Sequence, residues 1–355
     1  MFRKATKQEK WQVRPNKSNR RFIMGKMFSQ IIGLCITMVF IPGVMAFAAP
    51  QKKIEFKFSH YMPITHFSHK ASQMIVDEIQ KKSKGNIKVH LYPAAQLYKS
   101  NDTHEAVREG YVEMAWVATS YWASVDVSTA LFDVPFLFDD SEQVFKAMEG
   151  DLAREFSKLL RKQGVEVLAY MHYGFVNGIG TSKRPVKNTS DLRGMKIRSF
   201  GLLNGKTFEA LGAAPVNLAT GEVYTAMQRG TIDAGFTGVS SFASRKWYEV
   251  MKYCAVLPLT YVIYPVMVNP KWWATVPDDA KKIITGAAHV GADYTKRASV
   301  TDYEKSIKTL KDKGMEVYVV PTKELGKWRE RTKPVWDFYV QQGGEEAKKL
   351  LNLAR

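Results

Sequence analysis

Four stretches in the middle of the chain decide the fold. They are Asn177–Val186 (NGIGTSKRPV), Asp191–Arg198 (DLRGMKIR), Leu211–Val216 (LGAAPV) and Gly221–Ala234 (GEVYTAMQRGTIDA). The last stretch has helical spacing from Glu222 to Arg229, a stop at Gly230, and the start of an apolar strand pattern after it. Strand and helix patterns alternate in the same way along the rest of the chain. This alternation predicts an α/β protein with mostly parallel sheets faced by helices.

Three helical patterns outside this region extend the prediction. Residues 144–163 and Trp247–Tyr253 have helical spacing, and the spacing continues almost unbroken from Pro277 to Lys313. The last pattern is long for a globular protein, whose helices usually run about 8–20 residues. No linker composition separates two domains. A chain of this length has enough residues for two cores, so we expect two lobes between which the chain crosses back and forth.

The first 48 residues have the layout of a secretory signal peptide. Nine basic residues and one acid precede an uncharged apolar stretch, which Pro42-Gly43 ends and which Ala46-Phe47-Ala48 follows as a small-x-small cleavage pattern. An uncleaved anchor is the alternative, but the apolar core is short for a span of about 20 residues. We therefore predict that residues 1–48 are a signal peptide and that the protein is periplasmic. The leader is long, which leaves the true start codon open.

The charge that remains after the leader argues against a nucleic-acid partner. The whole chain has 52 Lys and Arg, 34 Asp and Glu, and a formal net charge of +18. Without residues 1–48 it keeps 43 basic and 33 acidic residues, or +10, and the two signs are interleaved. Nucleic-acid binding clusters positive charge on one face. Only Cys254 remains after cleavage, so no disulfide forms within the mature chain, and we expect a monomer.

The order of these stretches resembles the solute-binding proteins of TRAP transporters, the DctP-type family. Further similar segments are Tyr92–Leu97, Asp133–Phe138, Trp247–Val250 and Asn269–Pro277. The resemblance implies a two-lobed periplasmic-binding-protein fold with crossing strands at a hinge and one long helix shared by both lobes. It places lobe I at residues 49–175 plus about 262–302, and lobe II at about 176–261 plus 303–355. It also implies an extracytoplasmic subunit that captures a carboxylate, such as a C4-dicarboxylate, in the interlobe cleft and delivers it to the TRAP permease subunits.

The resemblance points to Arg198 as the anchor of the solute carboxylate. A planar guanidinium matches a carboxylate with two parallel hydrogen bonds, which lysine cannot do. Two positions depart from the family pattern. Gly178 stands where sialic-acid-type members carry a second arginine, and Thr237 stands where many members carry an asparagine that holds the carboxylate. We therefore expect a smaller acid than sialic acid. Whether Thr237 replaces the asparagine in function is open.

The rest of the site is expected on loops that follow strands, because open α/β sheets bind ligands at the carboxyl ends of their strands. The predicted solute-binding residues besides Arg198 and Thr237 are His60, Tyr61, Thr119, Trp122 and Thr220, and the neighbours Ser120 and Tyr121 are further candidates. Each of these aromatic side chains could instead belong to the core.

Two functions other than solute binding are also compatible with parts of the sequence. His66 and His69 are three residues apart at a helix start, which suggests a metal carrier, but the nearby sequence lacks the further ligands that zinc sites use. An enzyme acting on a small acid is the other alternative. The sequence has no Gly-x-Ser-x-Gly elbow, no His-Glu-x-x-His and no phosphate-binding glycine loop. We predict no catalytic residues, no metal site and no cofactor. The sequence does not name the acid.

Overall fold

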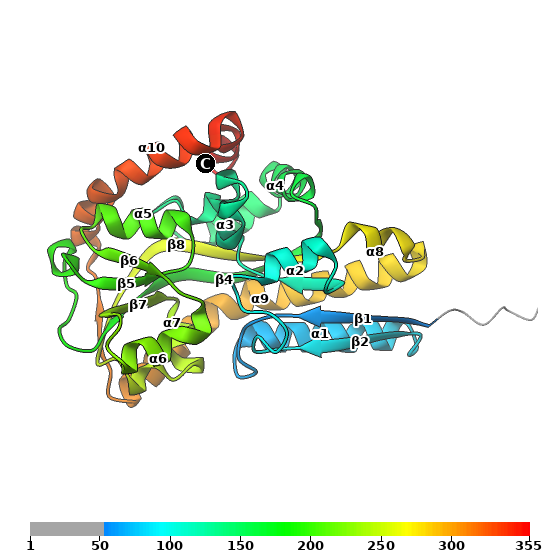
Figure 1. The fold of residues 1–355 in the computed structure, drawn as a ribbon, viewed down its shortest axis with the longest axis horizontal. Coiled ribbons are helices and arrows are strands. Elements are labelled where there is room, and N and C mark those ends of the chain that lie inside the picture. The colour runs from blue at the N-terminus through cyan, green and yellow to red at the C-terminus, as the bar shows by residue number, and fades with distance from the viewer. Residues whose placement is uncertain (1–52) are drawn as a thin grey trace, which may run out of the picture. The chain divides into compact units, whose positions relative to one another are not determined.

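A computed structural model describes residues 53–355, which belong to one compact unit (Figure 1). The predicted signal peptide lies outside the described residues. No helix within 53–355 combines the length and the hydropathy that a membrane span needs.

The centre of this unit is one mixed sheet of nine strands. The strand order is β2-β1-β3-β8-β4-β7-β5-β6, and β9 pairs with β8. The strands are β1 (Ile54–Ser59), β2 (Ile87–Tyr92), β3 (Met114–Trp116), β4 (Glu166–Thr181), β5 (Lys196–Ser199), β6 (Ala214–Asn217), β7 (Ala234–Thr237), β8 (Tyr253–Val268) and β9 (Glu316–Val319).

Strands β4 and β8 run through both halves of the sheet (Figure 1). Each has 16 residues, and they pair antiparallel along their length. At one end β8 pairs with β3, and this half, with β1 and β2, is called the first lobe. At the other end β4 pairs with β7 and β8 with β9, and this half, with β5 and β6, is called the second lobe. The pairs β1–β2, β1–β3, β5–β6, β5–β7 and β8–β9 are parallel, in line with the predicted mostly parallel sheets, whereas β3–β8, β4–β7 and the crossing pair β4–β8 are antiparallel.

Ten α-helices cover the sheet within the described range. They are α1 (Phe67–Lys82), α2 (Thr103–Glu109), α3 (Ser141–Met148), α4 (Asp151–Lys162), α5 (Leu202–Ala210), α6 (Val223–Gln228), α7 (Val239–Ser244), α8 (Pro270–Thr275), α9 (Asp278–Asp312) and α10 (Thr322–Leu353). Short 3₁₀ turns are η1 (Thr119–Ser124), η2 (Val127–Asp133), η3 (Thr189–Leu192), η4 (Thr220–Glu222) and η5 (Trp247–Glu249).

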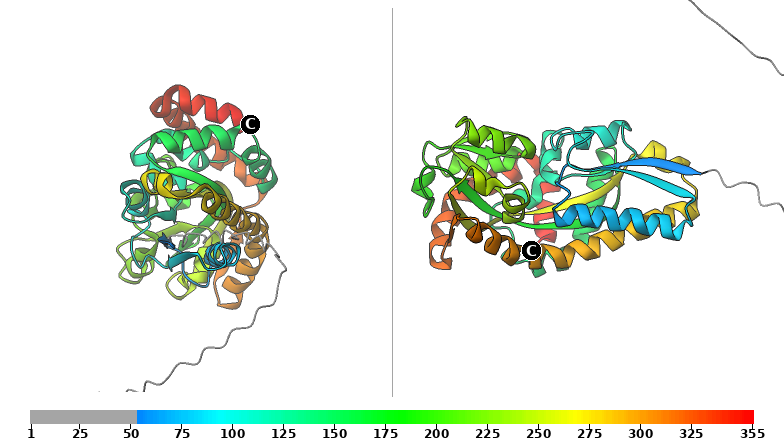
Figure 2. Two further views of the ribbon diagram at one scale, coloured as in Figure 1. Left: turned by 90° about the vertical axis from the view of Figure 1, so that its right-hand side faces the viewer. Right: turned by 90° about the horizontal axis from the view of Figure 1, so that it is seen from below.

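Helix α9 confirms the predicted long helix and is shared by the two lobes (Figure 2). Its 35 residues span about 52 Å at the usual helical rise. It packs against α1 in the first lobe, along β4, and against α7 and β9 in the second. A Cβ at Gly291 would lie 2.6 Å from the Ile75 side chain, so glycine there lets α1 approach closely.

Two predicted helices differ from the structure. The pattern over residues 144–163 is divided into α3 and α4, which Glu149 and Gly150 separate. The pattern at Trp247–Tyr253 forms only η5, because Tyr253 already pairs with Thr181 as the first residue of β8. Short apolar runs fit both helix and strand spacing, and here pairing with β4 prevails over local preference.

The lobe boundaries given above stay a prediction. Helix α10 packs against α5, and it also packs against η2 and α4. The Ser128 hydroxyl donates to the Gly343 carbonyl at 3.1 Å, and the Tyr339 hydroxyl donates to the Ser128 carbonyl at 2.9 Å. The C-terminal helix therefore holds elements on both sides of the crossing strands.

Candidate functional site

Three predicted residues meet at the carboxyl ends of strands in the second lobe. Arg198 lies near the end of β5, Thr220 begins η4 just after β6, and Thr237 is the last residue of β7. The strands β5, β6 and β7 are parallel neighbours. Parallel strands end at the same edge, which is where open α/β sheets place their ligands.

Three oxygen atoms near this edge of the sheet accept hydrogen bonds from the Arg198 guanidinium and fix its position. Its Nε donates to the Leu218 carbonyl at 3.0 Å, Nη1 to the Phe236 carbonyl at 2.8 Å, and Nη2 to the Thr220 hydroxyl at 2.8 Å. A guanidinium has five N–H donors, so one on each terminal nitrogen remains. The Tyr121 hydroxyl is a hydrogen-bonding neighbour of the guanidinium and favours its charged form. Donors on both terminal nitrogens match the two oxygens of a carboxylate.

The charge of Arg198 is buried without an acidic partner. Its side chain is 1% exposed and stacks on Phe200, with 4.6 Å from the guanidinium carbon to the ring centre. Burial lowers the pKa of the guanidinium, and the tyrosines around it act in the opposite direction. Within residues 53–355, the largest influences on its pKa include no carboxylate. A buried cation needs a compensating group, so this site favours an anion.

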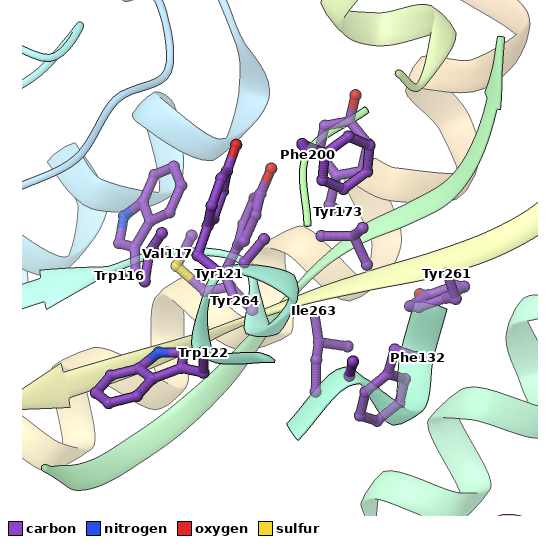
Figure 3. Packing of buried hydrophobic residues seen from close by; sticks show 14 of the residues in the cluster. Trp116, Val117, Tyr121, Trp122, Phe132, Tyr173, Phe200, Tyr261, Ile263 and Tyr264 are labelled. Atoms are coloured by element: carbon purple, nitrogen blue, oxygen red, sulfur yellow. The ribbon is translucent and has the colours of Figure 1, made fainter. Parts of the chain in front are cut away.

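Four tyrosines surround the free edge of Arg198. Tyr61 follows β1, Tyr121 lies in η1, Tyr173 lies on β4 and Tyr264 lies on β8. Tyr61 meets Tyr121 and Tyr264 edge-on, with ring centres 6.1 and 6.2 Å apart. Burial raises the pKa of the Tyr61 and Tyr264 hydroxyls, so both stay neutral hydrogen-bond donors at neutral pH. The first lobe and both crossing strands thus supply the aromatic part of the wall (Figure 3).

The two lobes close over this cluster and leave a very small cavity. Its volume is about 20 Å³, little more than one water molecule requires. The lining residues are Tyr61, Met62, Ala118, Tyr121, Tyr173, Arg198, Phe200, Thr220, Thr237, Ser241, Val262 and Tyr264. An organic acid is larger than this space, so it can enter only when the lobes separate or the wall side chains move.

The structure brings together four of the seven predicted site residues. Arg198, Thr220, Thr237 and Tyr61 line the cavity. His60, Thr119 and Trp122 do not line it in this closed arrangement. His60 precedes Tyr61 and stacks on Trp116, which does not line the cavity. The Trp122 ring meets His104, with 5.3 Å between ring centres, and points away from Tyr121 (Figure 3). In extended chain and in a tight 3₁₀ turn, the side chains of successive residues point in different directions. Of the pairs His60/Tyr61 and Tyr121/Trp122, therefore, only Tyr61 and Tyr121 line the cavity.

His60 instead belongs to a buried hydrogen-bond chain. Its Nδ1 accepts from the Met62 amide at 3.3 Å, so Nε2 carries the proton and donates to Nδ1 of His69 at 3.2 Å. The ring stacks on Trp116 at 4.7 Å. Burial lowers the pKa of His60 to about 3, so it is neutral at physiological pH. Within the described part of the chain, no group of three or more His, Cys, Asp or Glu residues is placed to hold a metal ion.

Several residues of the wall are not among those predicted from the sequence. Tyr173 donates to the Ser241 hydroxyl at 2.9 Å and lies 3.3 Å from the Thr237 hydroxyl, and Tyr264 faces it from β8 at 5.6 Å between ring centres. Both lie inside long apolar strands and have the pattern of core residues. Only the crossing of β4 and β8 beneath the cleft, which the sequence does not show, turns them toward the site.

Asp133 supports the first-lobe wall from behind. It is fully buried, and its Oδ1 accepts from the Ser120 hydroxyl at 2.8 Å, which fixes the turn η1 that carries Tyr121. Burial raises the pKa of the Asp133 carboxyl to about 7, although the hydrogen bond from Ser120 opposes this. The folded state therefore favours the protonated carboxyl. This contribution to stability is complete below the unfolded pKa of about 3.9 and is lost as the pH rises through 7.

Asp133→Asn should stabilise the protein at alkaline pH, because it removes a buried negative charge and keeps the shape. We expect an increase in unfolding free energy of about 2–4 kcal/mol at pH 8 that fades toward pH 4. Urea unfolding of both proteins at pH 8 and pH 5 measures it. Asp139→Asn, at an exposed ion pair with Arg329, is the control and should change little. Equal stability of wild type and Asp133→Asn at pH 8 would contradict the buried-charge account.

The chain as a whole is similar to known proteins in sequence and in fold. The family model described as bacterial extracellular solute-binding protein, family 7 (DctP), matches residues 58–342. The C4-dicarboxylate-binding periplasmic protein DctP of Rhodobacter capsulatus is 28% identical over 323 residues, which cover 89% of this chain and 96% of that protein. The 2,3-diketo-L-gulonate-binding periplasmic protein YiaO of Escherichia coli (strain K12) is 28% identical over 281 residues, 79% of this chain and 85% of that protein.

A solved structure shows the same fold. The sugar acid binding protein DctPAm from Advenella mimigardefordensis strain DPN7T, in complex with galactonate, superposes with a TM-score of 0.82. The two chains are 26% identical, and the match covers 85% of this chain and 98% of that one.

Proposed function

The chain belongs to the bacterial extracellular solute-binding proteins of family 7, and we propose that its solute is a small organic acid whose carboxylate pairs with Arg198. It is an extracytoplasmic solute-binding protein of the DctP type, a transport component. The observation that supports the proposal is the buried guanidinium, which keeps one N–H on each terminal nitrogen beyond its bonds to Phe236 and Thr220 and forms no ion pair with a carboxylate among residues 53–355.

The remaining wall defines the rest of the acid. Hydroxyl groups of Thr220, Thr237 and Ser241 come from the second lobe, and tyrosine hydroxyls come from the other side. Such a wall can hydrogen-bond a second carboxylate or the hydroxyl groups of a sugar acid. These are the two kinds of solute named for the relatives: a C4-dicarboxylate and galactonate. Thr237 would supply one hydrogen bond where an asparagine would supply two.

The solute is expected to work by closing the lobes. Arg198 lies in the second lobe, and Tyr61 and Tyr121 lie in the first, so an acid between them contacts both lobes only in the closed state. A ligand shifts a conformational equilibrium by its difference in affinity for the two states. We further propose that the protein is exported by residues 1–48, acts in the periplasm as a monomer, hands the acid to TRAP permease subunits, and leaves it chemically unchanged.

Calorimetry with succinate, malate, galactonate, erythronate and glucuronate tests the proposal. At least one acid should bind, its neutral amide or ester should bind far more weakly, and mass spectrometry should recover it intact. Small-angle scattering with the tightest acid should give a smaller radius of gyration than the free protein. Formation of a product would favour the enzyme alternative, and an unchanged radius at saturation would exclude closure.

A further inference from the structure

A second, half-buried arginine joins the two lobes near the proposed carboxylate anchor. Arg245 directly follows α7 in the second lobe, and its Nη2 donates to the Tyr61 carbonyl of the first lobe at 3.0 Å. The same nitrogen lies 3.5 Å from the Met62 sulfur. Tyr61 and Met62 both line the cavity around Arg198. Arg245 thus contacts two residues that line the cavity but does not line the cavity itself.

Two neighbours on α7 make contacts of the same kind. The Ser240 hydroxyl lies 3.2 Å from Nε2 of His66, and the Thr65 hydroxyl donates to the Ser244 carbonyl at 3.4 Å. Together with Arg245 they attach α7 to the loop of residues 61–66 between β1 and α1, near each other in Figure 1. We call this set of contacts the α7 latch. Because it joins the lobes directly and not through β4 or β8, it can exist only while the lobes are closed.

The charge of Arg245 opposes closure when the cleft holds no anion. Burial lowers the pKa of its guanidinium, tyrosines oppose this, and the nearby charge of Arg198 lowers it further. Its Nε is buried without a hydrogen-bond partner among the described residues. In that part of the chain the largest influences on the pKa of either arginine include no carboxylate. Closing the lobes therefore brings two unneutralised cations together in a low dielectric, which is unfavourable.

An anion on Arg198 reverses this balance. Its negative charge offsets both guanidinium groups, so the α7 latch can then form without the repulsion. We propose that Arg245 is a positioning residue that makes closure depend on the charge of the solute, in addition to holding Tyr61 at the site. This inference goes beyond the carboxylate contact of Arg198. It rests on the proposed function only in taking the solute to be an anion.

Three variants of Arg245 separate charge from hydrogen bonding. Arg245→Met removes both, Arg245→Gln removes the charge and keeps an N–H donor, and Arg245→Lys keeps the charge. Lys246→Gln, at the exposed neighbouring residue, is the matched control for loss of one positive charge. Small-angle scattering without solute is the main measurement. Thermal unfolding of each variant identifies any that is merely destabilised.

Without solute, wild type, Arg245→Lys and Lys246→Gln should have the larger radius of the open form. Arg245→Met and Arg245→Gln should move at least halfway toward the radius of the succinate-saturated wild type, or of the wild type with the tightest acid found by calorimetry. The preference of these two variants for the acid over its neutral amide should fall about fivefold or more, within the usual range of coupling between sites.

Two results would overturn the inference. One is a wild type that is already closed without solute, because the repulsion would then be too weak to matter. The other is an Arg245→Gln or Arg245→Met protein that stays folded, has the open radius and keeps the wild-type preference for acid. The solute-free radius does not depend on which solute binds. Failure of the carboxylate anchor at Arg198 would therefore be distinguished from failure of this inference.

Discussion

Replacing Arg198 by alanine is expected to weaken binding of the acid about 30- to 4,000-fold. Removing one partner of a buried, hydrogen-bonded charge pair costs about 2–5 kcal/mol, because the other charge stays desolvated and unpaired. Each 1.4 kcal/mol corresponds to a factor of ten in affinity. The effect should be at the large end of this range, because the tyrosines that surround the guanidinium offer the carboxylate only neutral donors. Calorimetry measures the loss.

Two further variants make the result specific. Arg198→Lys should recover only part of the affinity, because an ammonium group cannot donate in parallel to both carboxylate oxygens while also reaching the carbonyls of Leu218 and Phe236. Arg184→Ala is the control, because Arg184 is exposed and does not line the cavity. Circular dichroism confirms that each protein is folded. Binding by Arg198→Ala within a few-fold of wild type would show that the carboxylate lies elsewhere.

The meeting of Arg198, Thr220 and Thr237 could be predicted from the sequence because their surroundings are local. These residues lie at or just after the ends of three strands within 42 residues of chain, and parallel neighbours must end at one edge. The 35-residue helix α9 was visible for a similar reason, since its periodicity is continuous. In both cases short-range pattern and long-range packing agree.

The aromatic wall and the α7 latch could not be predicted in this way. Arg245 meets Tyr61 across 184 positions of sequence, and nothing near either residue marks the contact. Tyr173 and Tyr264 are apolar-strand residues by pattern, and their role depends on where β4 and β8 cross. His60 and Trp122 were predicted for the site by position alone, but the face on which each neighbour lies decides which one reaches the cavity. These features depend on the meeting of the lobes, which leaves no local pattern in the sequence.

The α7 latch also contains a titratable group. His66 is 2% exposed and caps α1, where its Nδ1 accepts from the Ser68 amide at 3.1 Å. Its Nε2 therefore carries the proton and donates to Ser240 across the lobes. The ring stacks on Tyr173, with 5.6 Å between centres. Burial, followed by the charges of Arg245 and His60, holds the pKa of His66 well below its usual value near 6.5. Nδ1 cannot bind a second proton while its lone pair accepts the hydrogen bond from the Ser68 amide that caps α1.

Affinity for the acid is therefore expected to fall about 10- to 30-fold between pH 7.5 and pH 5. When the lobes separate, His66 loses Arg245 as a neighbour and gains water, so its pKa returns toward 6.5. The open state then binds more protons than the closed state below that value. Linkage makes closure less favourable by up to tenfold for each pH unit below about 6.5 and leaves it unchanged above pH 7.

His66→Asn provides the decisive comparison, because asparagine can still cap α1 but does not titrate in this range. Its affinity, measured by calorimetry with the same acid so that protonation of the solute cancels, should be nearly constant over the same interval. Circular dichroism at pH 5 checks that both proteins stay folded, since burial also lowers the pKa of His60 to about 3 and of His172 to about 4. Parallel pH profiles for wild type and His66→Asn would assign the titration to another group, and a flat wild-type profile would show that His66 stays neutral in the open state as well.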